Sequence, residues 1–197
     1  MALLHSTQSE LGSRALAFSL SGVDGKTYSL DSFKNQKALL IVFMCNHCPY
    51  VIAIHDRLSE LAREFASKEV AVLGINSNDP NYKEADSFEN MKKTAKEWNL
   101  AFPYVMDETQ EVARSYDAVC TPDPYLYENV AWGTGGADFR LRYRGRIDDS
   151  WKDPAAIQEQ SLKRAIEGVL AGKKDLGNQV PSMGCSIKWK ELTPKKS

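Results

Sequence analysis

Residues 38–49 decide the fold, and they read Ala38-Leu39-Leu40-Ile41-Val42-Phe43-Met44-Cys45-Asn46-His47-Cys48-Pro49. The stretch before the first cysteine is almost continuously apolar, as expected of a strand that is covered on both faces. After the cysteines, apolar residues recur at helical spacing: Val51, Ile54, Leu58, Leu61, Ala62 and Phe65. The stretch therefore predicts a buried strand that leads into a helix through a Cys-x-x-Cys turn.

Two cysteines at this spacing have two common uses: they close a disulfide within one turn, or they present two thiolates to a metal ion. A buried strand that enters a helix through Cys45 and Cys48 is typical of a thioredoxin-like redox site. Structural zinc usually needs a second Cys/His pair at similar spacing, and none follows. We therefore predict thiol–disulfide chemistry without a metal. The rival interpretation is a non-catalytic zinc protein, in which Cys45, Cys48 and either Cys120 or Cys185 bind the ion together with a histidine.

The composition is that of an ordinary globular protein. Of the 197 residues, 43% are apolar and 26% are charged, and the formal net charge is −1. This balance predicts neither nucleic acid nor an anionic membrane as a partner. Neither a signal peptide nor a membrane span is recognisable, so we expect a cytoplasmic protein whose cysteines are kept reduced until they act. We expect a single domain, 1–197, that ends in an irregular tail, 173–197.

The remaining pattern predicts an α/β protein with a thioredoxin-like fold. The expected elements are a hairpin over 16–30, a strand over 70–75, a helix over 84–98, a strand over 104–106, a helix over 111–116, a closing hairpin of 124–127 and 140–144, and a last helix that starts at Asp153 and ends at Gly172. The first strand, its helix and the strand over 70–75 make a right-handed parallel crossover. This order predicts a central mixed sheet flanked by helices, with an N-terminal hairpin extension and an inserted segment.

Four segments carry a resemblance to a known family, and they read Phe43-Met44-Cys45-Asn46-His47-Cys48-Pro49, Thr121-Pro122-Asp123-Pro124-Tyr125-Leu126, Tyr143-Arg144-Gly145-Arg146-Ile147-Asp148-Asp149 and Gly184-Cys185-Ser186-Ile187-Lys188-Trp189. In them the chain resembles the peroxiredoxin-like branch of the thioredoxin superfamily, the alkyl hydroperoxide reductase/thiol-specific antioxidant (AhpC/TSA) type that keeps a Cys-x-x-Cys pair. The resemblance implies an antioxidant or other redox role. It also implies that Thr121 and Pro122 form a cis-proline loop that faces the redox pair, and an X–Pro bond costs only about 0.5–1 kcal/mol to hold cis.

We expect Cys45 to be the attacking thiol. At the mouth of a helix its sulfur would face unpaired backbone N–H groups and the positive end of the helix dipole, which both favour a thiolate. Cys48 would then resolve the mixed disulfide. If the helix begins as late as Cys48, however, this second thiol gains part of the same stabilisation. A protonated His47 would stabilise the thiolate and make the disulfide more oxidising, while its alternative is an exposed residue without effect.

Two departures from related proteins bear on the reaction. Peroxiredoxins resemble one another in a Pro-x-x-x-Thr-x-x-Cys pattern, which is absent here whether it is counted from Cys45 or from Cys48. Thioredoxins carry a buried acid six positions before the first cysteine, where this chain has Leu39. The proton acceptor must then come from elsewhere or from water. Our candidate is Asp123, between two prolines of the facing loop, and its alternative role is a turn residue that bonds its own backbone.

Two further cysteines are candidate redox residues. Cys120 lies two residues before Pro122, and Cys185 lies in a tail that would fold back over the body. Either thiol could react with a sulfenic acid formed on Cys45. The alternative for Cys120 is a small buried side chain.

The sequence therefore predicts a thiol–disulfide oxidoreductase that cycles Cys45 and Cys48 between dithiol and disulfide. The nearest alternative is a thiol-dependent (alkyl hydro)peroxidase, in which Cys45 attacks a hydroperoxide and Cys48 condenses with the sulfenic acid. A redox sensor that uses the same pair to switch an interaction is a further alternative. No cofactor motif is present, so the electrons must come from a thioredoxin-like protein or from a small thiol. Nothing in the pattern specifies an oligomeric state.

Overall fold

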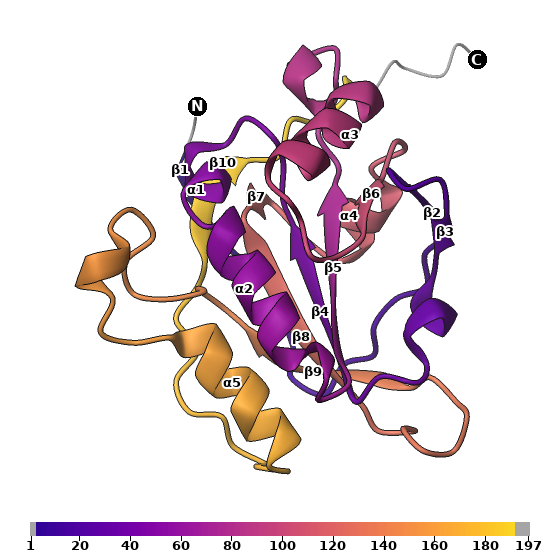
Figure 1. Ribbon diagram of the computed structural model, residues 1–197, viewed down its shortest axis with the longest axis vertical. Coiled ribbons are helices and arrows are strands. Elements are labelled where there is room, and N and C mark those ends of the chain that lie inside the picture. The colour runs from indigo at the N-terminus through magenta and orange to yellow at the C-terminus, as the bar shows by residue number, and fades with distance from the viewer. Residues whose placement is uncertain (1–2, 192–197) are drawn as a thin grey trace.

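A computed structural model describes residues 3–191, and residues 1–2 and 192–197 lie outside that range. Its centre is a seven-stranded mixed sheet in the order β3-β2-β6-β5-β4-β8-β9, flanked by helices (Figure 1). The strands of this sheet are β2 (Leu20–Gly22), β3 (Thr27–Tyr28), β4 (Ala38–Phe43), β5 (Val70–Asn76), β6 (Tyr104–Met106), β8 (Asp123–Asn129) and β9 (Phe139–Arg144). The predicted α/β class and central mixed sheet are confirmed.

The stretch that decides the fold forms the middle of this sheet. β4 pairs in parallel with β5, from Ala38 opposite Val70 to Phe43 opposite Ile75, and pairs antiparallel with β8 on its other side. Every residue of β4 is buried, which explains why the run contains no polar side chain. β5 continues in parallel to β6, and β8 pairs antiparallel with β9. The predicted crossover and closing hairpin are therefore confirmed.

β4 separates two hydrophobic cores, because successive side chains of a strand point to opposite faces of the sheet. Leu40 and Val42 belong to the core that contains residues of α2 (His55–Ala66), α3 (Phe88–Glu97) and α5 (Ser161–Leu170). Leu39 and Ile41 belong to the core that contains residues of α4 (Glu111–Ser115). Cys45 and Cys48 lie in the first of these cores. The redox motif is thus on the face of the sheet that α2 and α5 cover (Figure 1).

The helices are α1 (Pro49–Ile52), α2 (His55–Ala66), α3 (Phe88–Glu97), α4 (Glu111–Ser115) and α5 (Ser161–Leu170). Three of the predicted helices differ from these bounds. The helix after the cysteines is interrupted between α1 and α2. The helix predicted over 84–98 is a 3-10 turn, η2 (Glu84–Asp86), followed by α3, because Ser87 is extended and its hydroxyl caps the N–H of Asn90. The last helix begins at Ser161 rather than near Asp153, since Asp149 accepts hydrogen bonds from the backbone of Gln158 and Glu159 and holds that segment extended.

The predicted N-terminal hairpin is confirmed. β2 and β3 pair antiparallel, with Leu20 opposite Tyr28. β2 also pairs with β6, so the hairpin extends the central sheet at one edge.

A small second sheet has the order β1-β10-β7, with antiparallel pairing on both sides of β10. It consists of β1 (Leu3–His5), β7 (Cys120–Thr121) and β10 (Met183–Ser186). The tail that we expected to be irregular therefore contributes a strand within its described part, 173–191. Figure 1 shows β1 and β10 beside α1, at the end of the sheet where the cysteines lie. Among residues 3–191, no helix combines the length and the apolar character that crossing a bilayer requires.

Candidate redox site

The two cysteines of the motif lie at the entrance to α1. Cys45 follows the carboxyl end of β4, and Cys48 is the N-cap residue of α1, whose first residue is Pro49. All four cysteines of the chain are free thiols, and neither Cys45 nor Cys48 exposes any surface. Because α1 begins this late, its unpaired N–H groups favour a thiolate on Cys48 as well as on Cys45. Because α1 is a single turn, we expect direct hydrogen bonds to matter more than the helix dipole.

Thr121 contacts both sulfurs from the opposite side. The peptide bond between Thr121 and Pro122 is cis, as the resemblance implies. Cys45 Sγ lies 3.4 Å from Thr121 Oγ1, and Cys48 Sγ lies 3.1 Å from the Thr121 carbonyl oxygen. The cis-proline loop therefore faces the redox pair and contacts each cysteine through a different atom.

The two thiols share their protons unequally. The pKa of Cys48 is lowered, first by a hydrogen bond from the Cys45 thiol and also by one from the Cys185 thiol, and these outweigh the effect of burial. The pKa of Cys45 is raised well above the usual value, first by burial and then by its role as donor to Cys48, and the negative charge of Asp86 raises it further. The structure therefore favours a thiolate on Cys48 and a proton on Cys45. The sequence alone favours the reverse order, with Cys45 as the attacking thiol, whereas this proton distribution favours attack by Cys48.

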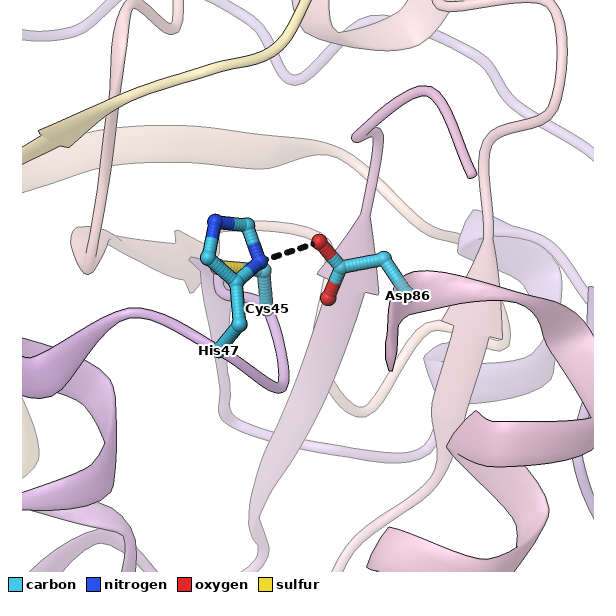
Figure 2. Close-up of side chains that lie close together, drawn as sticks. All are labelled: Cys45, His47 and Asp86. Carbon is cyan, nitrogen blue, oxygen red and sulfur yellow. Dashed lines mark hydrogen bonds and ion pairs between the residues drawn. The ribbon is translucent and has the colours of Figure 1, made fainter. Parts of the chain in front are cut away.

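A buried carboxylate that the sequence reasoning missed holds His47 beside the pair. The Nδ1 atom of His47 lies 2.5 Å from Asp86 Oδ2 (Figure 2). The side chain of His47 is only 9% exposed, and that of Asp86 is fully buried. The Cys45 sulfur, an imidazole nitrogen of His47 and a carboxylate oxygen of Asp86 all lie within 4.8 Å of one another. His47 is therefore in contact with the redox site rather than an exposed bystander.

Asp86 is held by a set of N–H donors. Its Oδ1 accepts from the backbone N–H of Asn46 at 2.8 Å and from the amide of Asn76 at 3.4 Å, and its Oδ2 accepts from the amide of Asn78 at 2.9 Å. Burial by itself would raise the pKa of Asp86, but the hydrogen bonds from His47, Asn78 and Asn46 lower it overall. Asp86 is thus an ionised acceptor that orients the imidazole, as the third member of a nucleophile–base–carboxylate set does.

Cys45, His47 and Asp86 also have the donor types of a metal site. Each oxygen of Asp86, however, already accepts two hydrogen bonds, which leaves its lone pairs occupied. The arrangement therefore fits a hydrogen-bonded relay better than a set of metal ligands.

Asp123, our candidate proton acceptor, has a different partner. Its carboxylate pairs with the guanidinium of Arg144 at 2.7 Å and accepts from the hydroxyl of Tyr125 at 3.2 Å. The side chains of Asp123 and Arg144 are 0% and 2% exposed. Burial raises the pKa of Asp123 to about 6, although Arg144 opposes the shift. The carboxylate thus belongs to a buried ion pair and makes no hydrogen bond to Cys45 or Cys48.

The two remaining cysteines are both buried in the small sheet. Cys120 pairs with Ser186 across β7 and β10, and burial raises its pKa. Cys185 lies opposite Thr121 in the same pair of strands and in the buried core that holds Cys45 and Cys48, and burial raises its pKa. The structure therefore brings Cys185 to the redox pair and leaves Cys120 outside that core.

One signal in the sequence could have located part of the missed network. β4 and β5 are parallel neighbours, so polar residues after their carboxyl ends meet at the same edge of the sheet. Asn46 follows β4, and Asn76 and Asn78 lie at or just after the end of β5. Asp86 carried no such signal, because the sequence pattern places it inside a helix.

Comparison with known proteins supports this fold and shows the family. Residues 11–144 match the model of the AhpC/TSA family. A solved structure of an uncharacterized conserved protein from Geobacillus kaustophilus is 41% identical, with a TM-score of 0.88 over 98% of this chain and 99% of that one. The thioredoxin domain of a thiol-disulfide oxidoreductase from Bacteroides vulgatus has a TM-score of 0.53 at 21% identity, over 70% of this chain and 91% of that one. Thiol-disulfide oxidoreductase ResA of Geobacillus thermodenitrificans (strain NG80-2) is 25% identical over 118 residues, or 60% of this chain and 63% of ResA.

The chain thus combines a thioredoxin-like fold with a Cys-x-x-Cys pair opposite a cis-proline. It belongs to the AhpC/TSA family, whose model covers more than half of the chain. The predicted fold and family are confirmed. The match to ResA spans 63% of that curated relative's length.

Proposed function

We propose that this protein reduces substrate disulfides, or in the reverse direction oxidises substrate dithiols, by cycling Cys45 and Cys48 between dithiol and disulfide. The observation that carries the proposal is the buried Cys45–Cys48 pair beneath the cis-proline loop, where Thr121 contacts both sulfurs. The thiolate is the reactive form of cysteine. A second thiol in hydrogen-bond contact with it is placed to complete an internal disulfide.

The reaction takes two exchange steps. In the first, the Cys48 thiolate attacks a sulfur of the substrate disulfide, a mixed disulfide forms, and the other substrate sulfur leaves as a thiolate that takes a proton from water. In the second, Cys45 loses its proton and attacks the Cys48 sulfur, so that the Cys45–Cys48 bond forms and the remaining substrate thiolate leaves. The substrate disulfide gains two electrons, and the cysteine pair loses them.

His47 supplies the proton acceptor that the second step needs. Cys45 is mainly protonated in the resting site, because its pKa is raised. An imidazole nitrogen of His47 lies within 4.8 Å of its sulfur, and Asp86 fixes the orientation of the ring. A positioned base of this kind contributes roughly 10²–10⁴-fold to a proton transfer step.

The cycle closes when an electron donor reduces the Cys45–Cys48 disulfide. We propose a thioredoxin-like protein or a small thiol for this role, since the same exchange chemistry runs in reverse with any thiolate. A reducing compartment such as the cytoplasm would keep the pair in the dithiol form, and we retain that location as a proposal.

The test offers the reduced protein two oxidants separately, oxidised glutathione and hydrogen peroxide. We expect oxidised glutathione to produce a Cys45–Cys48 bridge, and stopped-flow mixing with peroxide to show slow consumption, because the Pro-x-x-x-Thr-x-x-Cys pattern is absent. Rapid peroxide consumption with no reaction towards glutathione would indicate a thiol peroxidase with an antioxidant role instead. Stoichiometric zinc that suppresses thiol reactivity in the purified protein would overturn both functions.

A further inference from the structure

The sulfur of Cys48 has two thiols in its neighbourhood. Cys45 lies three residues before it in the motif, and Cys185 approaches from the strand that contacts α1 directly after Cys48. Cys185 lies in β10 opposite Thr121, the residue that contacts both redox sulfurs from the cis-proline loop. All three cysteines belong to the same buried core. Cys48 therefore shares its surroundings with two other thiols, Cys45 of the motif and Cys185 of β10.

The strand that carries Cys185 is fixed in this position by contacts on both of its edges. β10 lies between β1 and β7, with Leu3 opposite Cys185 on one side. Just before the strand, the hydroxyl of Ser182 donates to the Pro122 carbonyl at 2.6 Å. A Cβ at Gly184 would lie 1.9 Å from the Thr121 carbonyl oxygen, so glycine is what allows β10 to approach the cis-proline loop this closely. Cys185 is thus held against the redox pair by the fold and is not a loosely placed side chain.

We propose that Cys185 is a third redox thiol, which exchanges into the disulfide of the catalytic pair. This inference rests on the proposed function, because the Cys45–Cys48 disulfide is its starting point. The Cys185 sulfur attacks the Cys48 sulfur, the Cys45–Cys48 bond breaks, and a Cys48–Cys185 bond forms. The proton of Cys185 passes to the released Cys45 sulfur, directly or through His47. One thiol and one disulfide become another thiol and another disulfide, so no external oxidant or reductant is needed.

The exchange has a structural consequence. The new bond ties β10 to the start of α1, and it returns Cys45 to the thiol state beside His47. Because Cys45 and Cys48 expose no surface while β10 is in place, this bond would also keep the pair covered. The oxidised protein would therefore exist as two disulfide isomers, one with a Cys45–Cys48 bond and one with a Cys48–Cys185 bond.

Cys120 provides a matched control. Like Cys185, it is a buried cysteine of the small sheet, but it lies opposite Ser186 rather than Thr121 and outside the core that holds Cys45, Cys48 and Cys185. The key variant is Cys45→Ser, which leaves Cys48, Cys120 and Cys185 in the full chain. The protein is oxidised with oxidised glutathione, quenched in acid, digested and mapped by mass spectrometry, after circular dichroism has shown that the variant is folded. Cys45→Ala is used if the serine variant does not fold.

In the Cys45 variant we expect Cys48–Cys185 as the main internal bridge, unchanged by Cys120→Ser and replaced by glutathionylated Cys48 after Cys185→Ser. In oxidised wild type we expect a fraction of Cys45 to be alkylated, and this fraction to vanish in Cys185→Ser. Glutathionylated or free Cys48 with Cys185 still present would overturn the inference, as would a bridge to Cys120. Failure of the wild-type protein to form any Cys45–Cys48 bridge would reject the proposed function. A normal Cys45–Cys48 bridge in the wild type, together with no Cys48–Cys185 bridge in the Cys45 variant, would reject this inference alone.

Discussion

Removal of the Cys45 thiol is the most direct test of how the site distributes its protons. The hydrogen bond from Cys45 is the largest cause of the lowered pKa of Cys48, ahead of burial, which acts in the opposite direction. The substitution Cys45→Ala removes this donor and leaves the second donor, Cys185, in place. The pKa of Cys48 should therefore rise, without reaching the value that burial alone would impose.

The size of the change follows from the kind of bond that is lost. A hydrogen bond to a charged group contributes about 1.5–3 kcal/mol. One pKa unit corresponds to about 1.4 kcal/mol, so we expect the pKa of Cys48 to rise by about 1–2 units in Cys45→Ala. Cys45→Ser is the matched control, because a serine hydroxyl still donates to the thiolate and should raise the pKa less.

The assay follows alkylation by iodoacetamide as a function of pH and quantifies each cysteine-containing peptide by mass spectrometry. Only the thiolate reacts, so the rate of labelling rises as pH passes through the pKa of each site. In wild type, Cys48 should be labelled at a lower pH than a free cysteine, whose pKa is about 8.5, and Cys45 only at a higher pH. The reasoning fails if Cys45 is labelled first in wild type, or if the Cys48 profile is the same in Cys45→Ala. The first of these results would restore Cys45 as the attacking thiol.

Three further substitutions probe the surroundings of the pair. Asp86→Asn places an amide donor among N–H donors, which should lower the free energy of unfolding by about 1–3 kcal/mol in urea titrations. It should also slow the formation of the Cys45–Cys48 disulfide in stopped-flow traces. An unchanged rate of disulfide formation would remove the carboxylate from the mechanism. Asp123→Asn leaves Arg144 buried without a counter-charge and should cost about 3–5 kcal/mol of stability, so an unchanged urea midpoint would contradict the assigned ion pair. Gly184→Ala forces a Cβ to within 1.9 Å of a backbone oxygen unless β10 moves. It should lower the free energy of unfolding by about 1–3 kcal/mol and speed the alkylation of Cys48. Equal alkylation rates in the variant and the wild type would show that β10 does not limit access to Cys48.

Most of the central sheet could be predicted from the sequence, because its signals are local. The continuous apolar run at 38–43 marks a strand that is buried on both faces, and the structure has β4 at those residues. The positions at which helices begin were harder, since contacts from distant residues set them. Asp149, for example, holds Gln158 and Glu159 extended and delays α5, and no helical periodicity reports such a contact.

The site was predictable in its cysteines and not in its electrostatics. Spacing identified Cys45 and Cys48, and the resemblance identified Thr121, but the ionisation of each thiol depends on neighbours that are far away in the chain. Asp86 was missed because the helix pattern runs through it, whereas the chain forms a 3-10 turn there. The tail offered no periodic pattern, and β10 forms because β7 and β1 supply partners on both of its edges.

The structure explains why position 39 does not supply the proton acceptor of this site. The side chain of Leu39 packs in the core on the opposite face of the sheet from the cysteines, fully buried. A carboxylate there would be desolvated on the far side of the sheet from the two sulfurs. His47 instead lies beside Cys45 and is 9% exposed, so a proton taken from Cys45 can leave to solvent without crossing either core. The donors around Asp86 lower its pKa, which keeps the carboxylate ionised as the acceptor that orients His47 on this route.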